Sequence, residues 1–268
     1  MKNAKVVGFI GGNGEMAKLF IPIFKSRGYK IIISDKRTPL SNQEVTHQAD
    51  IVIISVPIMK TKEVIREIIP WTRKGQLLMD LTSLKSEPVH EMQKGKADVI
   101  GLHPMFGPTI SSLDGQRIIM CPEQSPNKKF IQKILEEEGL NVHITTPEKH
   151  DKNMGVIQIL IHFHSIMLGH TLKSLNVDLK EIEEFMSPIY RLEFGVIARI
   201  FSQDPDLYGP ILMMNPEKHE ILKQIDVNTK NLSNIVECSD LTLFREFFKK
   251  TSKYLGKYSE IADKMIET

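Results

Sequence analysis

The stretch Lys5-Val-Val-Gly-Phe-Ile10, followed at once by Gly11-Gly-Asn-Gly-Glu-Met-Ala17, decides the fold of this chain. Its first half is an apolar run typical of a buried strand, and a helical pattern continues after its second half to about residue 27. Gly12, Gly14 and Ala17 fit the spacing G-x-G-x-x-G/A. The first glycine permits a tight turn, the second lets the backbone approach a pyrophosphate, and the small third residue lets helix and strand pack closely. The stretch predicts a dinucleotide site with the phosphates at the helix N-terminus.

An acidic residue lies where such a site needs one. Asp35 ends a second predicted strand, 30–35, and stands 23 residues after Gly12. A carboxylate there accepts the adenosine ribose hydroxyls and disfavours a 2′-phosphate, so NAD is the predicted cofactor. Lys36 and Arg37 follow at once and can accommodate that phosphate, which leaves the strictness for NAD over NADP open. The predicted cofactor contacts are Gly12, Asn13, Gly14, Glu15, Met16, Asp35, Ser55, Val56 and Pro57.

The composition is that of a globular protein without a strong charge bias. Its 268 residues suffice for two modest domains, and the net charge of +2 favours neither nucleic acid nor a membrane surface as a partner. No apolar run is expected to approach the roughly 18 residues that span a bilayer. Cys121 and Cys238 lie far apart and form no metal-ligand spacing and no disulfide framework. We therefore predict a cytoplasmic protein without a metal site.

The pattern of secondary structure changes near residue 147. Before it, near-continuous apolar strands alternate with helices, which is typical of a parallel sheet covered on both faces. After it, strand patterns vanish and helical patterns take over. We predict an α/β, Rossmann-like dinucleotide-binding domain over 1–148, followed by an all-helical domain over 149–268. The further strands are expected at 51–56, 77–80, 99–102, 118–121 and 141–145, and the helices near 60–69, 127–138, 149–174, 179–201, 206–225 and 239–267.

Polar residues stand at the ends of three of these strands. Ligands of an open α/β sheet bind beyond the carboxyl ends of the strands, and Ser55, Ser83, Lys85 and His103 all lie at such ends. His103 begins a Pro/Gly turn, 103–108, which predicts a fixed backbone and an accessible ring. Histidine titrates in the right range to act as a base while a hydride leaves an alcohol carbon, and a lysine can hold an anionic substrate. A turn histidine bonded only to backbone, and ordinary loop roles for Ser83 and Lys85, are the alternatives.

Two arginines mark the helical domain. Arg191 and Arg199 are eight residues apart, so on a continuous helix they share roughly one face. Guanidinium groups on an apolar face are costly unless anions pair with them, and a substrate with carboxylates would supply those partners. An internal pair with Glu193 or with another helix is the alternative. His162 and His164 point in different directions on a helix, so no shared metal is predicted for them.

The assembled residues resemble the prephenate dehydrogenase family over nearly the whole chain. The markers are the glycine turn, Asp80-Leu-Thr-Ser-Leu-Lys85, Gly101-Leu-His-Pro-Met-Phe-Gly-Pro108, His150-Asp-Lys-Asn-Met154 and Ser187-Pro-Ile-Tyr-Arg-Leu-Glu193. The closest similarity is to the dehydrogenase half of the enteric fusion with chorismate mutase. We expect a stand-alone dehydrogenase, because the chain starts at the first predicted strand. Ala17 replaces the family's usual glycine, which is compatible with close packing.

The resemblance implies an NAD-dependent oxidative decarboxylation of prephenate to 4-hydroxyphenylpyruvate, a step toward tyrosine. It makes His103 the acceptor of the ring hydroxyl proton, Ser83 a hydrogen-bond partner of that hydroxyl or of the histidine, and Lys85 a residue lining the pocket. It assigns a substrate carboxylate to Arg199, with Arg191 in support. The resemblance also places His162 near the substrate and implies a homodimer built through the helical domain; Tyr208 is a further candidate substrate contact.

Other readings differ in substrate or in class. The alternative substrates are 4-amino-4-deoxyprephenate, in which an amine replaces the ring hydroxyl, and arogenate, which carries an amino acid side chain. The β-hydroxyacid dehydrogenases share the α/β-then-helical plan, but they typically place a lysine on the first helix of the second domain, and 155–161 contains none. A nucleotide sensor without activity would give no reason for a histidine and two arginines to face one crevice. Feedback by tyrosine would have to act at the active site.

Overall fold

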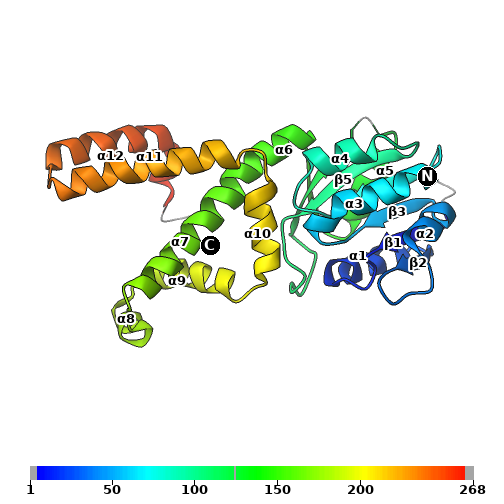
Figure 1. The fold of residues 1–268 in the computed structure, drawn as a ribbon, viewed down its shortest axis with the longest axis horizontal. Helices are drawn as coiled ribbons and strands as arrows, with labels where there is room; N and C mark the ends of the chain where they lie inside the picture. The colour runs from blue at the N-terminus through cyan, green and yellow to red at the C-terminus, as the bar shows by residue number, and fades with distance from the viewer. Residues whose placement is uncertain (1–4, 124, 263–268) are drawn as a thin grey trace. The chain divides into compact units, whose positions relative to one another are not determined.

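The computed structural model describes residues 5–123 and 125–262, which form two units (Figure 1). The sheet unit comprises Met1–Ile157 and Asp206–Pro216, and the helical unit comprises Gln158–Pro205 and Glu217–Thr268. The sequence predicts a boundary at 148, whereas the contacts divide the chain at 157 and return 206–216 to the sheet unit. Each unit is described by itself.

The sheet unit is built on a sheet of seven strands in the order β2-β1-β3-β4-β5-β6-β7. The expected α/β architecture is confirmed, but β6 runs antiparallel to β5 while the other described pairs are parallel. The connection between these two strands, 105–116, contains no helix, and a parallel pairing would need a crossover. The strands are β1 Val6–Ile10, β2 Lys30–Ser34, β3 Ile51–Ile54, β4 Leu77–Asp80, β5 Asp98–Pro104, β6 Arg117–Cys121 and β7 Asn141–Ile144.

Two apolar clusters cover the two faces of this sheet. Alternate residues of a strand point to opposite faces, and in β1 Phe9 joins one cluster while Ile10 joins the other. The Phe9 cluster packs on α1 (Glu15–Lys25) and α5 (Lys128–Glu137). The Ile10 cluster packs on α2 (Asn42–Gln48), α3 (Ile58–Ile68), the short helix η1 (Ile69–Trp71) and α4 (Ser86–Met92). The strands therefore read as continuous apolar runs because both faces are buried.

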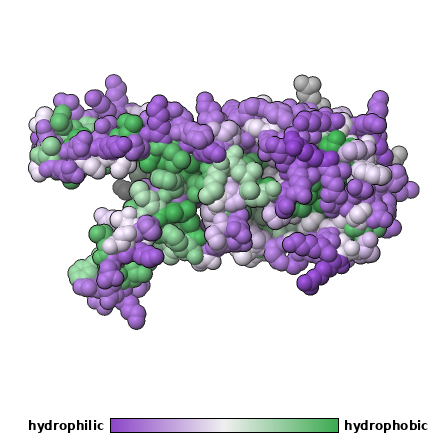
Figure 2. Space-filling view, viewed as in Figure 1, coloured by the Kyte–Doolittle hydropathy of each residue, from purple (hydrophilic) through white to green (hydrophobic). Residues whose placement is uncertain are grey.

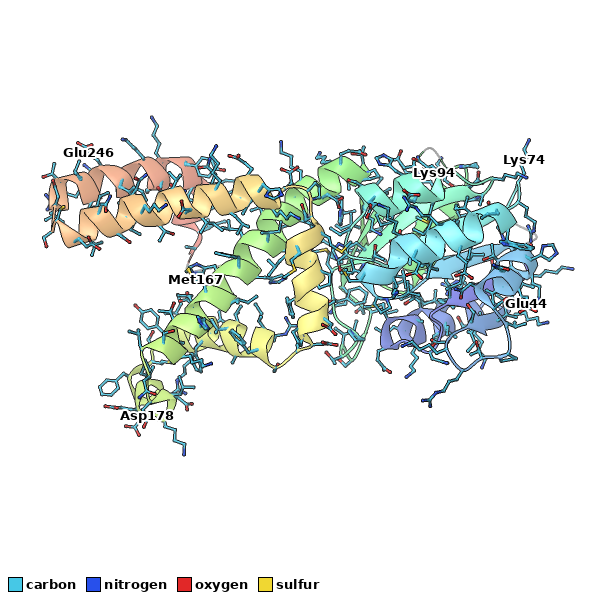
Figure 3. The ribbon with its side chains drawn as sticks, in the orientation of Figure 1. Glu44, Lys74, Lys94, Met167, Asp178 and Glu246 are labelled. Atoms are coloured by element: carbon cyan, nitrogen blue, oxygen red, sulfur yellow. The ribbon has the colours of Figure 1, made fainter. Side chains whose placement is uncertain are left out.

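The sequence patterns did not predict the helices α2 and α4. A capping box begins α2: the Ser41 hydroxyl accepts from the Glu44 amide, and the Glu44 carboxylate, labelled in Figure 3, accepts from the Ser41 amide. The spacing S-x-x-E at 41–44 was the available signal. Both helices have only seven residues, too few for an apolar stripe to stand out.

The second half of the chain is helical, as expected. Proline cannot continue a helix without losing a backbone hydrogen bond, and the predicted helix 179–201 breaks before Pro188 while 206–225 breaks around Pro216. Asp178, labelled in Figure 3, caps α8 by accepting from two backbone amides. The predicted helix 239–267 extends beyond the described residues. The elements are α6 Pro147–Met154, the π-helix η2 Gly155–Leu160, α7 Ile161–Ser174, α8 Leu179–Phe185, α9 Pro188–Phe201, α10 Pro205–Met214, α11 Lys218–Glu237, α12 Leu241–Leu255 and α13 Lys257–Glu260.

The helical unit exposes much apolar surface. Figure 2 shows hydrophobic residues gathered along its helices, whereas the sheet unit is largely hydrophilic in this view. By length and composition, one helix within the described part of the chain, Pro147–Ser174, could cross a membrane. This one helix is weak evidence for a membrane span, because a core helix of a soluble protein passes the same test. A helix whose exposed apolar face packs against another protein surface has the same composition.

Candidate active site

The glycine turn between β1 and α1 leaves no room for side chains. A Cβ at Gly11, where φ is 77°, would lie 2.4 Å from the Ser55 carbonyl oxygen. A Cβ at Gly12 would lie 2.6 Å from Ile33 of β2. The left-handed residue of the turn is thus Gly11 and not Gly12, which we expected to permit the tight turn; Gly12 is needed for its close approach to β2. Ala17 is fully buried in the helix–sheet core, as expected from its small size.

Asp35 closes the same turn from the end of β2. Its Oδ2 accepts from the Asn13 amide at 3.0 Å and its Oδ1 accepts from the Lys36 amide at 2.7 Å. Ser55 follows β3 directly beside the turn, and Pro57 is the N-cap residue of α3. The remaining predicted cofactor residues are Gly14, which precedes α1, Glu15 and Met16 in its first turn, and Val56 beside the turn. The fold therefore gathers the predicted cofactor residues at the carboxyl edge of β1, β2 and β3.

His103 lies one residue before the end of β5. Since Leu102 belongs to the Phe9 cluster, alternation turns His103 toward the opposite face, on which α4 lies. The side chain is only 3% exposed, so the expected accessible ring is wrong. His103 pairs with Ile119 of the antiparallel β6, and the ring of His150 from α6 packs against it edge to face, with the ring centroids 5.0 Å apart. These neighbours enclose the imidazole.

A hydrogen-bonded chain leads from His103 to a buried carboxylate. His103 Nδ1 lies 2.8 Å from His150 Nε2, and His150 Nδ1 lies 2.8 Å from Asp151 Oδ1. The Asp151 carboxylate also accepts from the backbone amides of Lys85 at 2.9 Å and Ser86 at 2.8 Å. These bonds join Asp151 to the start of α4, and the three side chains form one hydrogen-bonded unit.

Lys85 makes a buried ion pair beside the hydrogen-bonded series of His103, His150 and Asp151. Lys85 and Asp80 are both fully buried, and the ammonium donates to Asp80 Oδ2. The same oxygen accepts from the Thr82 hydroxyl at 2.7 Å and from its amide at 3.0 Å. Ser83 is half-buried in the turn between them. The described partner of the lysine ammonium is thus a protein carboxylate, which leaves a direct contact between Lys85 and a substrate as a prediction.

Burial and neighbouring charge keep His103 uncharged. Burial, followed by the charges of His150 and Lys85, lowers the pKa of His103 well below its ordinary 6.5. Burial also lowers the pKa of His150, against the opposing hydrogen bond to Asp151. Burial would raise the pKa of Asp151, but the hydrogen bonds from His150, Ser86 and Lys85 outweigh it and lower that pKa. At neutral pH the hydrogen-bonded series therefore consists of two neutral imidazoles, His103 and His150, and the charged carboxylate of Asp151.

Three of the four predicted substrate residues belong to the helical unit. Arg191 and Arg199 lie on the continuous helix α9, as predicted, but both are exposed, so the argument from the cost of burying them fails. Arg191 Nη2 donates to the Glu183 carbonyl oxygen at 3.4 Å. Burial, then the charge of Arg199, lowers the pKa of the half-buried His162. The fourth residue, Tyr208, is buried on α10 in the sheet unit.

The sequence analysis did not single out Asp80, His150 or Asp151 as site residues. His150 and Asp151 stood only in a marker of the family resemblance, and Asp80 stood at the end of a strand beside predicted site residues. The available signal was the adjacent pair of titratable residues His150 and Asp151 within that marker. Among the described residues no group of three His, Cys, Asp or Glu side chains is placed to hold a metal ion.

Two family models match the chain in succession. The model described as prephenate dehydrogenase, nucleotide-binding domain, matches residues 24–146, and the model described as prephenate dehydrogenase, dimerization domain, matches residues 146–250. The first match begins after the glycine turn, so the geometry of that turn is separate support for the nucleotide site.

Known proteins resemble the chain in sequence and in fold. The "Probable arogenate/prephenate dehydrogenase" of Methanocaldococcus jannaschii is 39% identical over 96% of this chain and 62% of its own length. The "T-protein" of Haemophilus influenzae is 34% identical over 94% of this chain and 67% of its own length. The chain thus spans about two thirds of these relatives. The crystal structure of prephenate dehydrogenase from A. aeolicus with hydroxyphenyl propionate and NAD+ matches with a TM-score of 0.74 at 22% identity, over 96% of this chain and 98% of that one.

Proposed function

This chain belongs to the prephenate dehydrogenase family, and on that premise we propose that it catalyses the NAD-dependent oxidative decarboxylation of prephenate to 4-hydroxyphenylpyruvate. One observation carries the proposal. His103 is neutral and enclosed near the carboxyl end of β5, and β5 belongs to the same sheet as β1, whose following glycine turn fits a dinucleotide. Bases and cofactors of open α/β sheets meet at this edge.

The cofactor is NAD, and the residues at the turn fit it. Gly11 and Gly12 leave a cradle that a Cβ would fill, and the N-cap residue of α1, Gly14, has no side chain to cap the first amides, which would receive phosphate oxygens. The Asp35 carboxylate already faces the turn, where it would accept the adenosine ribose hydroxyls. When bound, NAD supplies the acceptor for the hydride.

The chain's own residues accept the ring hydroxyl proton and bind the negatively charged carboxylates of the substrate. His103 accepts the proton of the ring hydroxyl as its carbon is oxidised to a carbonyl. When the ring carboxylate leaves as CO2, its bonding electron pair makes the ring aromatic and passes to the ring oxygen, which takes the proton back from His103. Ser83 hydrogen-bonds that hydroxyl or the histidine. Lys85 acts through its buried charge, which helps to keep His103 neutral. Arg199 holds a substrate carboxylate through parallel hydrogen bonds, with Arg191, His162 and Tyr208 in support.

Arogenate is the second candidate substrate, because the name of the M. jannaschii relative includes it. 4-Amino-4-deoxyprephenate would present an amine where His103 meets the hydroxyl. The purified protein should therefore be assayed for NADH production with NAD and each of the three substrates in turn. We expect the highest kcat/KM with prephenate. A higher value with either analogue would reassign the substrate, and no NADH with any of the three would contradict the proposal.

A homodimer would cover the exposed apolar face of the helical unit. One groove there is lined by Leu160 of η2, by Phe163 and Met167 of α7, the last of them labelled in Figure 3, and by Ile225 and Leu232 of α11. Contiguous apolar surface of this kind marks association sites, and the second matching family model is a dimerization domain. We expect twice the chain mass by light scattering. We also propose a cytoplasmic location, which the two unpaired cysteines, Cys121 and Cys238, support.

A further inference from the structure

The hydrogen-bonded chain of His103, His150 and Asp151 determines where protons sit on the two imidazoles. A carboxylate can only accept, so the 2.8 Å contact between His150 Nδ1 and Asp151 Oδ1 requires the proton on His150 Nδ1. The Nε2 of a neutral His150 is then an acceptor. The 2.8 Å contact between that atom and His103 Nδ1 requires the proton on His103 Nδ1.

The remaining nitrogen of His103 is Nε2, and this assignment leaves it with a lone pair. We propose that His150 and Asp151 are positioning residues, which hold His103 in the tautomer whose Nε2 is ready to accept the substrate's proton. The opposite tautomer would carry a proton on Nε2 and would be unable to act as a base. This inference rests on the proposed function for its kinetic consequence, but the tautomer itself exists without substrate.

The surroundings of Asp151 determine the donor-to-acceptor direction of the hydrogen bonds from His103 through His150 to Asp151. Both carboxylate oxygens are already engaged by the backbone amides of Lys85 and Ser86, so the group stays charged and does not rotate away. The Asn215 amide donates to the Asp151 carbonyl at 3.0 Å, which holds the backbone as well. His150 is 1% exposed, and a charged imidazole there would lose its hydration. A neutral His150 is thus an acceptor toward His103.

The same chain stabilises His103 after it takes the proton. An imidazolium at His103 keeps its Nδ1–H directed at His150 Nε2, and His150 directs its own Nδ1–H at the carboxylate. A carboxylate that orients a catalytic histidine in this way in serine proteases contributes orders of magnitude to kcat. Here one additional imidazole stands between the carboxylate and the base.

The test combines kinetics with the tautomer of His103, using the full chain with 15N-labelled histidine. In His150→Leu the acceptor is gone, and we expect kcat with prephenate to fall about 10–100-fold while KM changes less than about threefold. In His150→Gln the amide oxygen can still accept from His103 Nδ1, so most of kcat should return. His90→Leu is the matched control, because His90 is exposed on α4 and pairs with the surface residue Glu148.

Nitrogen chemical shifts report the tautomer, with the His103 signals assigned by their loss in His103→Asn. We expect a protonated Nδ1 and an unprotonated Nε2 in the wild-type protein and in His150→Gln, and a mixture in His150→Leu. A wild-type His103 protonated at Nε2 would overturn the inference, as would a loss of kcat in His150→Leu without a change of tautomer. If His150→Leu does not fold, the wild-type and His150→Gln spectra decide. If the wild-type protein does not oxidise prephenate, the proposed function fails while the spectra still test the tautomer.

Discussion

A Cβ atom at Gly101 would lie 2.9 Å from Cδ of Lys85, so a missing side chain in the middle of β5 makes room for a buried lysine. The same Cβ would lie 2.7 Å from Val89 of α4 and 3.4 Å from Oδ1 of Asp80. Gly101 pairs directly with Asp80 across β4 and β5. The glycine thus allows the Asp80–Lys85 ion pair to lie flat against the sheet, two residues before His103.

Gly101→Ala should therefore lower the free energy of unfolding. Overpacking a filled core costs about 1–3 kcal/mol, and the neighbours here include a buried ion pair that cannot move into solvent. Gly107→Ala is the control, since no atom lies within 4 Å of its added Cβ. Denaturant titration of both variants checks the prediction. Equal stability of the two would show that α4 can shift to admit the methyl group.

His103→Asn should lower kcat by about 10²–10⁴-fold and leave the NAD dissociation constant nearly unchanged. The asparagine side chain has no group that can take up a proton, whereas the substitution leaves the glycine turn and Asp35 unchanged. Steady-state kinetics with prephenate and titration of NAD binding by fluorescence measure the two effects. An unchanged kcat would remove His103 from the chemistry.

Arg199→Ala should raise the substrate KM by about 10–100-fold, the expected range for losing hydrogen bonds to a charged group. The pKa of His162 should also rise, because the charge of Arg199 lowers it. Kinetics and a histidine NMR titration follow the two effects separately. Arg245→Ala, on the exposed side of α12, is the control. A normal KM together with a raised His162 pKa would make Arg199 a neighbour of that histidine without a role in substrate binding.

Stability should fall on acidification. The pKa values of His103 and His150 are lower in the folded state than the ordinary 6.5, so the unfolded chain binds protons first as the pH drops. Their stabilising contribution is therefore complete above about pH 6.5 and is lost toward the folded-state pKa values, by about 1.4 kcal/mol for each unit of pKa difference. Urea unfolding at about pH 7.5 and about pH 5 should show this loss. His103→Asn should show a smaller loss, and an equal loss would assign the effect to other groups.

Asp35→Ser should shift cofactor preference from NAD toward NADP by tenfold or more. The substitution removes the carboxylate that repels a 2′-phosphate, while the exposed Lys36 and Arg37 stay in place to attract one. The ratio of kcat/KM values for the two cofactors measures the shift. The wild-type ratio also answers whether the enzyme is strict for NAD.

Much of the sheet unit could be predicted because its signals are local. The strand, glycine turn and helix at 5–25 are contiguous, and each buried strand is a short apolar run. Asp35 and His103 stood out because they follow such runs directly. The antiparallel direction of β6 was not predicted, because an apolar run does not encode the direction of its partner. The short connection 105–116, which contains no helix, was the available signal.

The amino-acid sequence by itself determined an α/β sheet with a dinucleotide turn and a histidine at its carboxyl edge, because strand periodicity and turn chemistry act over a few neighbouring residues. Only the tertiary structure decided what surrounds that histidine. His150 lies 47 residues from His103 along the sequence. Asp151 lies 66 residues from Lys85, whose amide donates to its carboxylate. These contacts therefore exist only once α6 packs beside α4. Burial then sets the protonation of these groups, because the loss of water changes which charged forms are stable.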